Sequence, residues 1–444
     1  MSKKLYLVSL GCPKNLVDSE VMLALLEKAG YCVCQGPAEA DLMLVNTCGF
    51  IQSAVEEGID EIIGLAAYKA RDPGKRLVVT GCMVQRYGQE LAKEFPEVDL
   101  FVGTEGFQDI VGILEKMTPG SNPGPFLAKP LFLMDSHSPR KISTPSHRAY
   151  LKVTEGCANR CSYCLIPSLR GPLRSRPVDD IIREAQRLED GGVKELTLVA
   201  QDLTAYGIGR GQSSPLLDRL LLSLLKETAI PWLRLLYLQP ARLDDSLLQI
   251  MADNPRLLPY LDIPLQHVST RMLKLMNRPY DTAFIEAMLS RIRTIVPEVA
   301  IRTTLMVGFP GETEDDMRLL EEFIRTYRFE HVGVFPYSNE DGCAASNLPD
   351  QCPEGVKIER RHRLMELQAG ISLENHKGML GKTEEVLVEG VSRETDLLLE
   401  GRTARQAPEI DGCVYIASGE CNAGDIVEVR FTEAHTYDLV GEIV

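Results

Sequence analysis

The stretch Cys157-Ala-Asn-Arg-Cys161-Ser-Tyr-Cys164 places three cysteines in one short loop. It follows residues 149–154, whose apolar run predicts a buried strand. Iron–sulfur clusters are held by cysteine thiolates, and three ligands on a four-iron cluster leave one iron without a protein ligand. A structural zinc loop is the alternative, but closed zinc sites need a fourth ligand and usually combine separated C-x2-C pairs. The spacing favours a cluster whose open iron can bind a substrate.

Strands and helices alternate on the C-terminal side of this loop. The helical patterns include 178–188 and 314–327. Strands are predicted at 149–154, 195–200, 232–238, 260–264, 301–307 and 331–335. Six strand–helix units suggest a central partial (β/α) barrel.

The regions on either side have a different pattern. Residues 4–117 alternate shorter strands (5–10, 41–46, 76–80, 100–102) with helices (17–29, 53–70, 85–95), which predicts a doubly wound parallel sheet in an α/β fold. Beyond 378, short runs between Gly and Asp turns predict a small antiparallel β-barrel. We place the domains at 1–120, 147–377 and 378–444, with a Pro/Gly/Ser-rich linker at 121–146.

Three further cysteines, Cys12, Cys48 and Cys82, each come shortly after a predicted N-terminal strand. Ligands bind outside the carboxyl ends of strands in open parallel sheets, so these thiols can converge although they are far apart in sequence. The alternative is three buried structural cysteines, because free Cys is among the most buried residue types. We treat the remaining six cysteines as structural or incidental; they are Cys32, Cys34, Cys343, Cys352, Cys413 and Cys421.

Polar residues and glycines at the predicted strand ends of the barrel are candidate cofactor contacts. Gln201 and Asp202 follow the strand 195–200, and Gly308 and Gly311 follow 301–307. Barrel active sites gather at this end, where amide or carboxylate groups can bind ribose hydroxyls and glycines can admit a nucleoside. Simple turn chemistry is the alternative for the glycines. His267 lies either in this site or in a structural hydrogen bond.

Composition limits the class of protein. The chain has 444 residues, 44% of them hydrophobic and 25% charged, which predicts a globular protein of about three domains. The net charge of -15 argues against general nucleic-acid binding and favours a basic partner. We find neither a signal peptide nor an apolar run of membrane-spanning length, so we expect a cytoplasmic protein.

With these residues identified, the chain resembles the radical S-adenosylmethionine (radical SAM) methylthiotransferases over nearly its whole length. The C-x3-C-x2-C loop with Tyr163 before its last cysteine resembles the radical SAM signature. Cys12, Cys48 and Cys82 match the N-terminal cluster domain of the family, and the last segment resembles its TRAM barrel.

The resemblance implies a transferase with two 4Fe–4S clusters and S-adenosylmethionine. Cys157, Cys161 and Cys164 would hold the catalytic cluster, with Tyr163, Gln201, Asp202, Gly308 and Gly311 as cofactor contacts. One electron, from a donor such as flavodoxin or ferredoxin, would release a 5'-deoxyadenosyl radical that removes hydrogen from an unactivated carbon. The cluster on Cys12, Cys48 and Cys82 would carry the sulfur to be inserted, and a second S-adenosylmethionine would supply the methyl group.

Two branches of this family differ in substrate. One modifies adenosine beside the tRNA anticodon, and the other, of RimO type, modifies an aspartate β-carbon of small-subunit ribosomal protein S-twelve. The stretches 11–15 (GCPKN), 405–411 and 435–444 resemble the RimO type. Residues 378–444 hold 14 acidic and 5 basic residues, so this barrel should repel RNA and attract a basic ribosomal protein. A merely solvated acidic surface is the alternative reading of the charge.

The sequence leaves three hypotheses for the function of this protein. The main hypothesis is the ribosomal-protein methylthiotransferase, acting as a monomer without strong tRNA binding. The first alternative is a tRNA adenosine 2-methylthiotransferase. The second is an iron–sulfur carrier or redox sensor, which would bind clusters but would not cleave S-adenosylmethionine.

Overall fold

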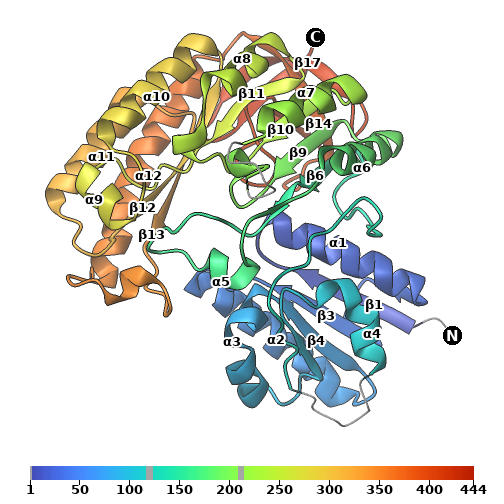
Figure 1. Ribbon diagram of the computed structural model, residues 1–444. Helices are drawn as coiled ribbons and strands as arrows, with labels where there is room; N and C mark the ends of the chain where they lie inside the picture. Colours follow the sequence, from blue (N-terminus) through green and yellow to red (C-terminus); the bar gives the residue numbers. More distant parts are fainter. Residues whose placement is uncertain (1–2, 117–123, 209–214) are drawn as a thin grey trace.

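The computed structural model describes residues 3–116, 124–208 and 215–444. The predicted domain end at 120 and the first predicted linker residues, 121–123, lie outside the described residues. Among the described residues, three larger β-structures follow one another along the chain, together with a two-stranded sheet of β7 (Thr154–Glu155) and β8 (Arg174–Ser175). Figure 1 shows the N-terminal structure set apart from the other two larger ones. This arrangement confirms the predicted fold class.

The N-terminal sheet has five parallel strands in the order β2-β1-β3-β4-β5. Alternate residues of β3 point to opposite faces: Leu44 packs with α1 and α4, and Val45 packs with α2 and α3. The sheet is therefore doubly wound. The strands are β1 (Lys3–Ser9), β2 (Tyr31–Val33), β3 (Leu42–Thr47), β4 (Arg76–Gly81) and β5 (Leu100–Val102), and the helices are α1 (Pro13–Lys28), α2 (Gln52–Arg71), α3 (Cys82–Glu94) and α4 (Ile110–Glu115).

The central sheet has six parallel strands in the order β13-β12-β11-β10-β9-β6, and it is an open, partial barrel. Its strands are β6 (Arg148–Lys152), β9 (Glu195–Val199), β10 (Trp232–Leu235), β11 (Leu257–Asp262), β12 (Ala300–Val307) and β13 (His331–Pro336). The α-helices between and after them are α5 (Ile166–Arg170), α6 (Val178–Asp190), α7 (Leu217–Glu227), α8 (Asp245–Asp253), α9 (Thr270–Leu275), α10 (Thr282–Ile295), α11 (Glu314–Tyr327) and α12 (Glu354–Lys377).

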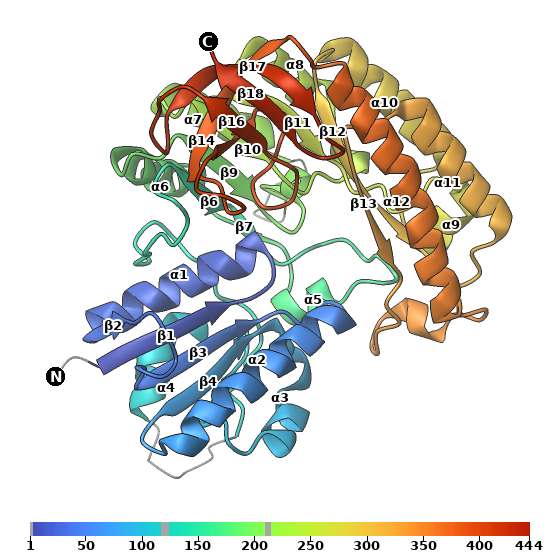
Figure 2. The same cartoon turned by 180° about the vertical axis from the view of Figure 1, so that it is seen from behind.

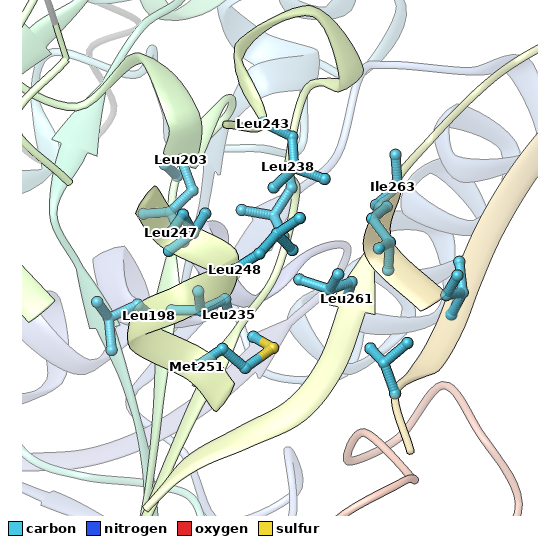
Figure 3. Packing of buried hydrophobic residues seen from close by; sticks show 14 of the residues in the cluster. Leu198, Leu203, Leu235, Leu238, Leu243, Leu247, Leu248, Met251, Leu261 and Ile263 are labelled. Carbon is cyan, nitrogen blue, oxygen red and sulfur yellow. The ribbon is translucent and has the colours of Figure 1, made fainter. Parts of the chain in front are cut away.

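The two faces of the central sheet differ in chemistry. One face is aliphatic and packs on the helices, and Figure 3 shows Leu247, Leu248 and Met251 of α8 against Leu235 and Leu261 of the strands. The opposite face carries polar and aromatic side chains, including Tyr150, Lys152, Thr197, Arg234 and Tyr260. A barrel that is aliphatic outside and polar inside is suited to hold polar ligands within it.

The last domain is a closed barrel in the order β14-β15-β16-β18-β17. The strands are β14 (Thr383–Val391), β15 (Leu399–Thr403), β16 (Val414–Ser418), β17 (Ile426–Ala434) and β18 (Leu439–Ile443). The pairs are antiparallel as predicted, except that β16 and β18 pair in parallel. Figure 2 shows this barrel lying against the central sheet.

Buried ion pairs join the barrel to the central sheet. Glu195 of β9 accepts from Arg234 at 2.6 Å and from Arg402 of the barrel at 2.5 Å. Barrel carboxylates point inward at the same junction: Glu389 pairs with Arg148, and Asp411 accepts from the hydroxyl of Tyr260 at 2.7 Å. Part of the acidic charge of the barrel is therefore used for docking inside the molecule.

The predicted linker lies against the folded domains. Arg140 is buried between Glu20 of α1 and Glu184 of α6, at 2.6 and 2.9 Å. Phe126 pairs with Val102 beside the N-terminal sheet. The described part of this segment thus ties the N-terminal domain to the central domain.

No helix within the described ranges is long and apolar enough to cross a membrane.

Candidate active site

Cys12, Cys48 and Cys82 converge at one edge of the N-terminal sheet. Cys12 precedes α1, Cys48 directly follows β3, and Cys82 begins α3 directly after β4. Strands β1, β3 and β4 are neighbours in the sheet, so the loops that carry the three thiols lie side by side. The pKa of Cys48 is raised in part by the charges of Cys82 and Cys12, which reflects this closeness.

Glycines allow these loops to touch. Gly11 has φ +90°, and a Cβ there would lie 2.8 Å from the Cβ of Cys48. Gly81 has φ +101°, and a Cβ there would lie 2.4 Å from the carbonyl oxygen of Thr47. A side chain at either position would be both strained and obstructed, so the glycines are needed to bring the cysteines together.

The three thiols differ in acidity. Burial raises the pKa of Cys48 to about 12, and it also raises the pKa of Cys82. Burial alone would raise the pKa of Cys12 too, but the positive charges of Lys14 and Arg170 outweigh it and bring that pKa below its ordinary value. Cys12 is therefore the thiol of this triad most easily converted to a metal-binding thiolate.

Arg170 contacts the N-terminal triad from the central domain. It ends the short helix α5 (Ile166–Arg170), which Figure 1 shows between the two domains. Its Nε lies 3.2 Å from Cys82 Sγ. Its Nη1 and Nη2 donate to Asp18 at 2.5 Å and to Asn15 at 3.0 Å. The buried guanidinium thus connects a cysteine sulfur with α1.

Lys152 and Glu155 extend this contact into a buried ionic network. Lys152 pairs with Asp18 and with Glu155, the latter at 2.8 Å. Burial alone would raise the pKa of Glu155, but Lys152 and Arg170 outweigh it and lower the pKa to about 2. Charged side chains from both domains therefore neutralise one another beside the cysteines.

Cys157, Cys161 and Cys164 form a second triad in the loop between β7 (Thr154–Glu155) and α5. Burial raises the pKa of Cys164 to about 12, and the charges of Cys161 and Cys157 add to the shift. Backbone N–H groups of Asn159 and Ile166 donate to the sulfurs of Cys157 and Cys164 at 3.4 and 3.5 Å. Such donors stabilise thiolates bound to a cluster.

Both triads offer free thiols that an iron–sulfur cluster could bind. All six cysteines are free thiols. Among the described residues, no three His, Cys, Asp or Glu side chains are already arranged around one ion. A four-iron cluster bonds its cysteines through different irons, so its ligands need not surround a single point. The cradle of touching glycine loops and N–H donors is consistent with that larger group.

The predicted polar contacts are already engaged within the protein. Asp202 accepts from Asn159 and Arg242, both at 2.7 Å. The amide nitrogen of Gln201 donates to Glu155 at 2.9 Å, and its buried Oε1 has no hydrogen-bond partner among the described residues. Their predicted contact with S-adenosylmethionine stays a prediction.

Tyr163 packs in an apolar cluster with Met276 and Phe309, beside the second triad. Gly308 lies against α12, where a Cβ would come within 2.3 Å of Lys357 Cγ. Gly311 has φ +76°, and its carbonyl accepts from Arg271 at 2.9 Å. The contacts of both glycines are those of turns, and their contact with a cofactor stays a prediction.

His267 has a structural role in this fold. Its Nδ1 accepts from the backbone N–H groups of Val268 and Ser269, at 2.8 and 2.9 Å. Its Nε2 lies 3.3 Å from Glu312, and the side chain is completely buried. The structural alternative predicted for this histidine therefore holds.

Two residues between the triads could not be found from the sequence. Arg170 lies in no motif, and its contact with Cys82 depends on domain docking. Cys343, set aside as incidental, is buried in an apolar cluster with Cys82, Leu165 and Leu169, and its charge influences the pKa of Cys164. No spacing in the sequence indicates that Cys343 lies between the two triads.

Three family descriptions match successive parts of the chain. Residues 4–103 match the uncharacterized protein family UPF0004, residues 151–324 match the radical SAM superfamily, and residues 380–444 match the TRAM domain.

Solved structures show a related fold at low identity. A radical S-adenosylmethionine methyltransferase, TsrM, from Kitasatospora setae has a TM-score of 0.55 at 15% identity, covering 75% of this chain and 73% of that one. The cobalamin-dependent S-adenosylmethionine radical enzyme OxsB has a TM-score of 0.53 at 10% identity, covering 83% of this chain and 56% of that one.

Curated relatives are similar over the whole chain. The protein named "Ribosomal protein uS12 methylthiotransferase RimO" of Desulfotalea psychrophila is 53% identical, with 99% of each chain covered. The protein of the same name from Citrifermentans bemidjiense is 48% identical, over 100% of this chain and 98% of its own. At this identity and coverage, the chain belongs to the RimO family of radical SAM methylthiotransferases.

Proposed function

We propose that this protein inserts a methylthio group at the β-carbon of an aspartate of ribosomal protein uS12. One observation carries the proposal: two cysteine triads are joined by a short chain segment that runs from Cys164 to Arg170, and Arg170 contacts Cys82. Insertion of sulfur into a C–H bond requires the radical source and the sulfur donor to act on the same carbon. A fixed connection between the two sites meets that requirement.

Cys157, Cys161 and Cys164 hold the first 4Fe–4S cluster in this proposal, and Cys12, Cys48 and Cys82 hold the second. When bound, the clusters and S-adenosylmethionine supply the one-electron chemistry, the methyl group and the sulfur. The chain itself neutralises the buried charges through the Arg170 network and donates N–H groups to the sulfurs. Its apolar surroundings, such as the cluster around Tyr163, exclude water.

The exposed acidic residues of the C-terminal barrel support the proposal that the substrate is a basic protein. Glu385 of β14 lies directly opposite Glu428 of β17 in the antiparallel register, and both are exposed. Like charges placed opposite each other destabilise a sheet, so a cationic partner would relieve the repulsion. Other exposed acidic residues of the barrel are Glu394, Asp396, Glu420, Asp425 and Glu433. A surface of this charge attracts a basic ribosomal protein and repels RNA phosphates.

We also propose that the protein works in the cytoplasm as a monomer and that it receives electrons from a small redox protein such as flavodoxin or ferredoxin. Its functional units have the bounds 1–120, 147–377 and 378–444.

Mass spectrometry after anaerobic reaction tests the function. The full chain with reconstituted clusters is incubated with purified uS12, S-adenosylmethionine and a reductant. We expect a methylthio mass gain on one aspartate of uS12 and none in a parallel incubation with tRNA. Unmodified uS12 in the presence of intact clusters would contradict the proposal.

The same samples separate the alternatives. Methylthio-adenosine in tRNA would identify a tRNA methylthiotransferase. Intact clusters without any 5'-deoxyadenosine would identify an iron–sulfur carrier or redox sensor.

A further inference from the structure

Lys14 is a buried lysine beside the N-terminal cysteine triad. It is the second residue of α1, two positions after Cys12, and only 8% of its surface is exposed. Its ammonium lies 3.4 Å from the centre of the Tyr237 ring. Among the described residues, this ammonium donates no hydrogen bond and forms no ion pair. Lys14 therefore brings a positive charge into the interior that acts on Cys12 and Asp262 but forms no ion pair with a carboxylate among the described residues.

The charged side chains near Lys14 interact with other groups. Asp262 accepts from the backbone N–H of Tyr237 at 3.0 Å and lies 3.8 Å from Arg302. Arg302 also lies 3.4 Å from Asp411 of the C-terminal barrel. Arg302 thus has two carboxylates within ion-pairing distance, whereas Lys14 has none among the described residues.

Tyr237 holds the ammonium from the other domain. It follows β10 at the carboxyl end of the central sheet, and its φ of +65° is unusual for a residue that is not glycine. Strained backbone of this kind persists where the surroundings enforce it, and it is common at ligand sites. The aromatic ring favours a cation above it but provides no anion. Ring and ammonium therefore form a preformed cationic site between the two domains.

A buried ammonium that forms no ion pair is unfavourable, because it has lost water and gained no direct counter-ion contact. A ligand that pairs with this ammonium should be small and anionic. An aspartate side chain fits this description, since an ammonium has three donors for a carboxylate. The γ-carboxylate is also bonded to the β-carbon, so holding the first positions the second.

We propose that Lys14 binds the γ-carboxylate of the substrate aspartate and thereby places its β-carbon beside the triad of Cys12, Cys48 and Cys82. The inference rests on the proposed function and names the residue that selects aspartate. Tyr237 is a positioning residue, because it acts through the ammonium of Lys14. The site accounts for the choice of a carboxylate side chain, which an acidic docking surface alone does not explain.

Binding of two forms of uS12 tests the inference. The reconstituted full chain is titrated with uS12 and with uS12 in which the modified aspartate is asparagine. We expect the wild-type protein to bind the aspartate form at least tenfold more tightly. In Lys14→Met the two forms should bind within about twofold of each other, and iron content is measured in every sample so that only proteins with equal cluster loading are compared. Lys226→Gln, at a lysine whose side chain is 80% exposed, is the matched control and should discriminate as the wild type does.

The stability of the empty protein gives a second readout. Removing an unpaired buried charge should raise the Tm of the substrate-free Lys14→Met protein, and Lys14→Arg should retain discrimination between the two uS12 forms. Equal discrimination by wild type and Lys14→Met would overturn the inference, as would a large loss of Tm in Lys14→Met. A wild-type protein that leaves uS12 unmodified would instead contradict the proposed function, so the two failures are distinguishable.

Discussion

Arg170 donates through Nε to the sulfur of Cys82 at 3.2 Å, although the two residues belong to different domains and are 88 positions apart in the chain. The same guanidinium pairs with Asp18 at 2.5 Å. Charge-assisted hydrogen bonds of this kind are about twice as strong as neutral ones. One side chain therefore joins the radical SAM domain both to a predicted cluster ligand and to the helix that follows Cys12.

Replacement of Arg170 by Gln should destabilise the protein by about 3 to 5 kcal/mol, because Asp18 and Glu155 would lose a buried counter-charge. Urea unfolding of the cluster-free chain measures this difference. Arg170→Lys keeps the charge and should lose less. Arg318→Gln, at a side chain that is 70% exposed, should have almost no effect. An unchanged free energy of unfolding in Arg170→Gln would show that the buried ionic network does not contribute to stability.

Separate alanine variants of the two triads should lose different activities. Cys157→Ala should abolish 5'-deoxyadenosine formation, because the predicted radical-generating cluster loses a ligand. Cys48→Ala should retain part of that activity but yield no methylthio product. Chromatography of 5'-deoxyadenosine and mass spectrometry of uS12 measure the two steps. Cys32→Ala, at an exposed cysteine, is the control, and circular dichroism verifies folding. Loss of both activities only through misfolding would contradict this division.

Gly81→Ala should lower both stability and iron binding at the N-terminal triad. The added Cβ would lie 2.4 Å from the carbonyl of Thr47, and φ is +101°. Gly30→Ala is a matched control, because Gly30 has φ +90° but nothing within 4 Å of its Cβ position. Backbone strain alone should cost Gly30→Ala about 1 kcal/mol, and Gly81→Ala should exceed that value. Equal losses in chemical unfolding would mean that the close approach of the loops is unimportant.

Replacement of Glu195 by Gln should destabilise the contact between the barrel and the central sheet in a pH-dependent way. Burial alone would raise the pKa of Glu195, but Arg402 and Arg234 outweigh it and lower the pKa from 4.5 to about 2. A carboxyl whose pKa is lowered by folding adds stability above its unfolded pKa and loses it as pH falls through the folded value. The difference from wild type should thus be about 3 to 5 kcal/mol at neutral pH and should shrink between pH 4.5 and 2. Unfolding curves across this range measure it, and a constant difference would contradict the assignment.

The acidic pair on the barrel should affect stability and substrate binding in opposite directions. Glu428→Gln removes the repulsion with Glu385, so the Tm should rise slightly. Association with uS12 should slow roughly twofold to fivefold at low salt, and the difference should fade at high salt. Stopped-flow mixing measures the rates. An association rate independent of both charge and salt would show that this surface does not guide the substrate.

The sequence predicts the parts of this protein that depend on local pattern. Alternating apolar runs indicate the parallel strands, and the strand ends indicate where Cys12, Cys48 and Cys82 meet. Contacts that depend on docking leave no such pattern. Arg170 lies outside every motif, and Arg140 lies in a segment whose composition indicates only a linker. The pattern beyond residue 378 predicts antiparallel pairing only and does not indicate the parallel pairing of β16 with β18, because register depends on neighbouring strands.

Helix α5 consists of only five residues, and its last residue is Arg170. One extra residue in α5 would turn every later side chain by about 100° around the helix axis. Arg170 would then point away from Cys82. Because Arg170 is itself the last residue of α5, no loop lies between the helix and Arg170 that could restore its direction. The number of residues from Cys164 to Arg170 therefore determines whether the guanidinium of Arg170 reaches Cys82. Related sequences should therefore differ by substitutions in this interval far more often than by insertions or deletions.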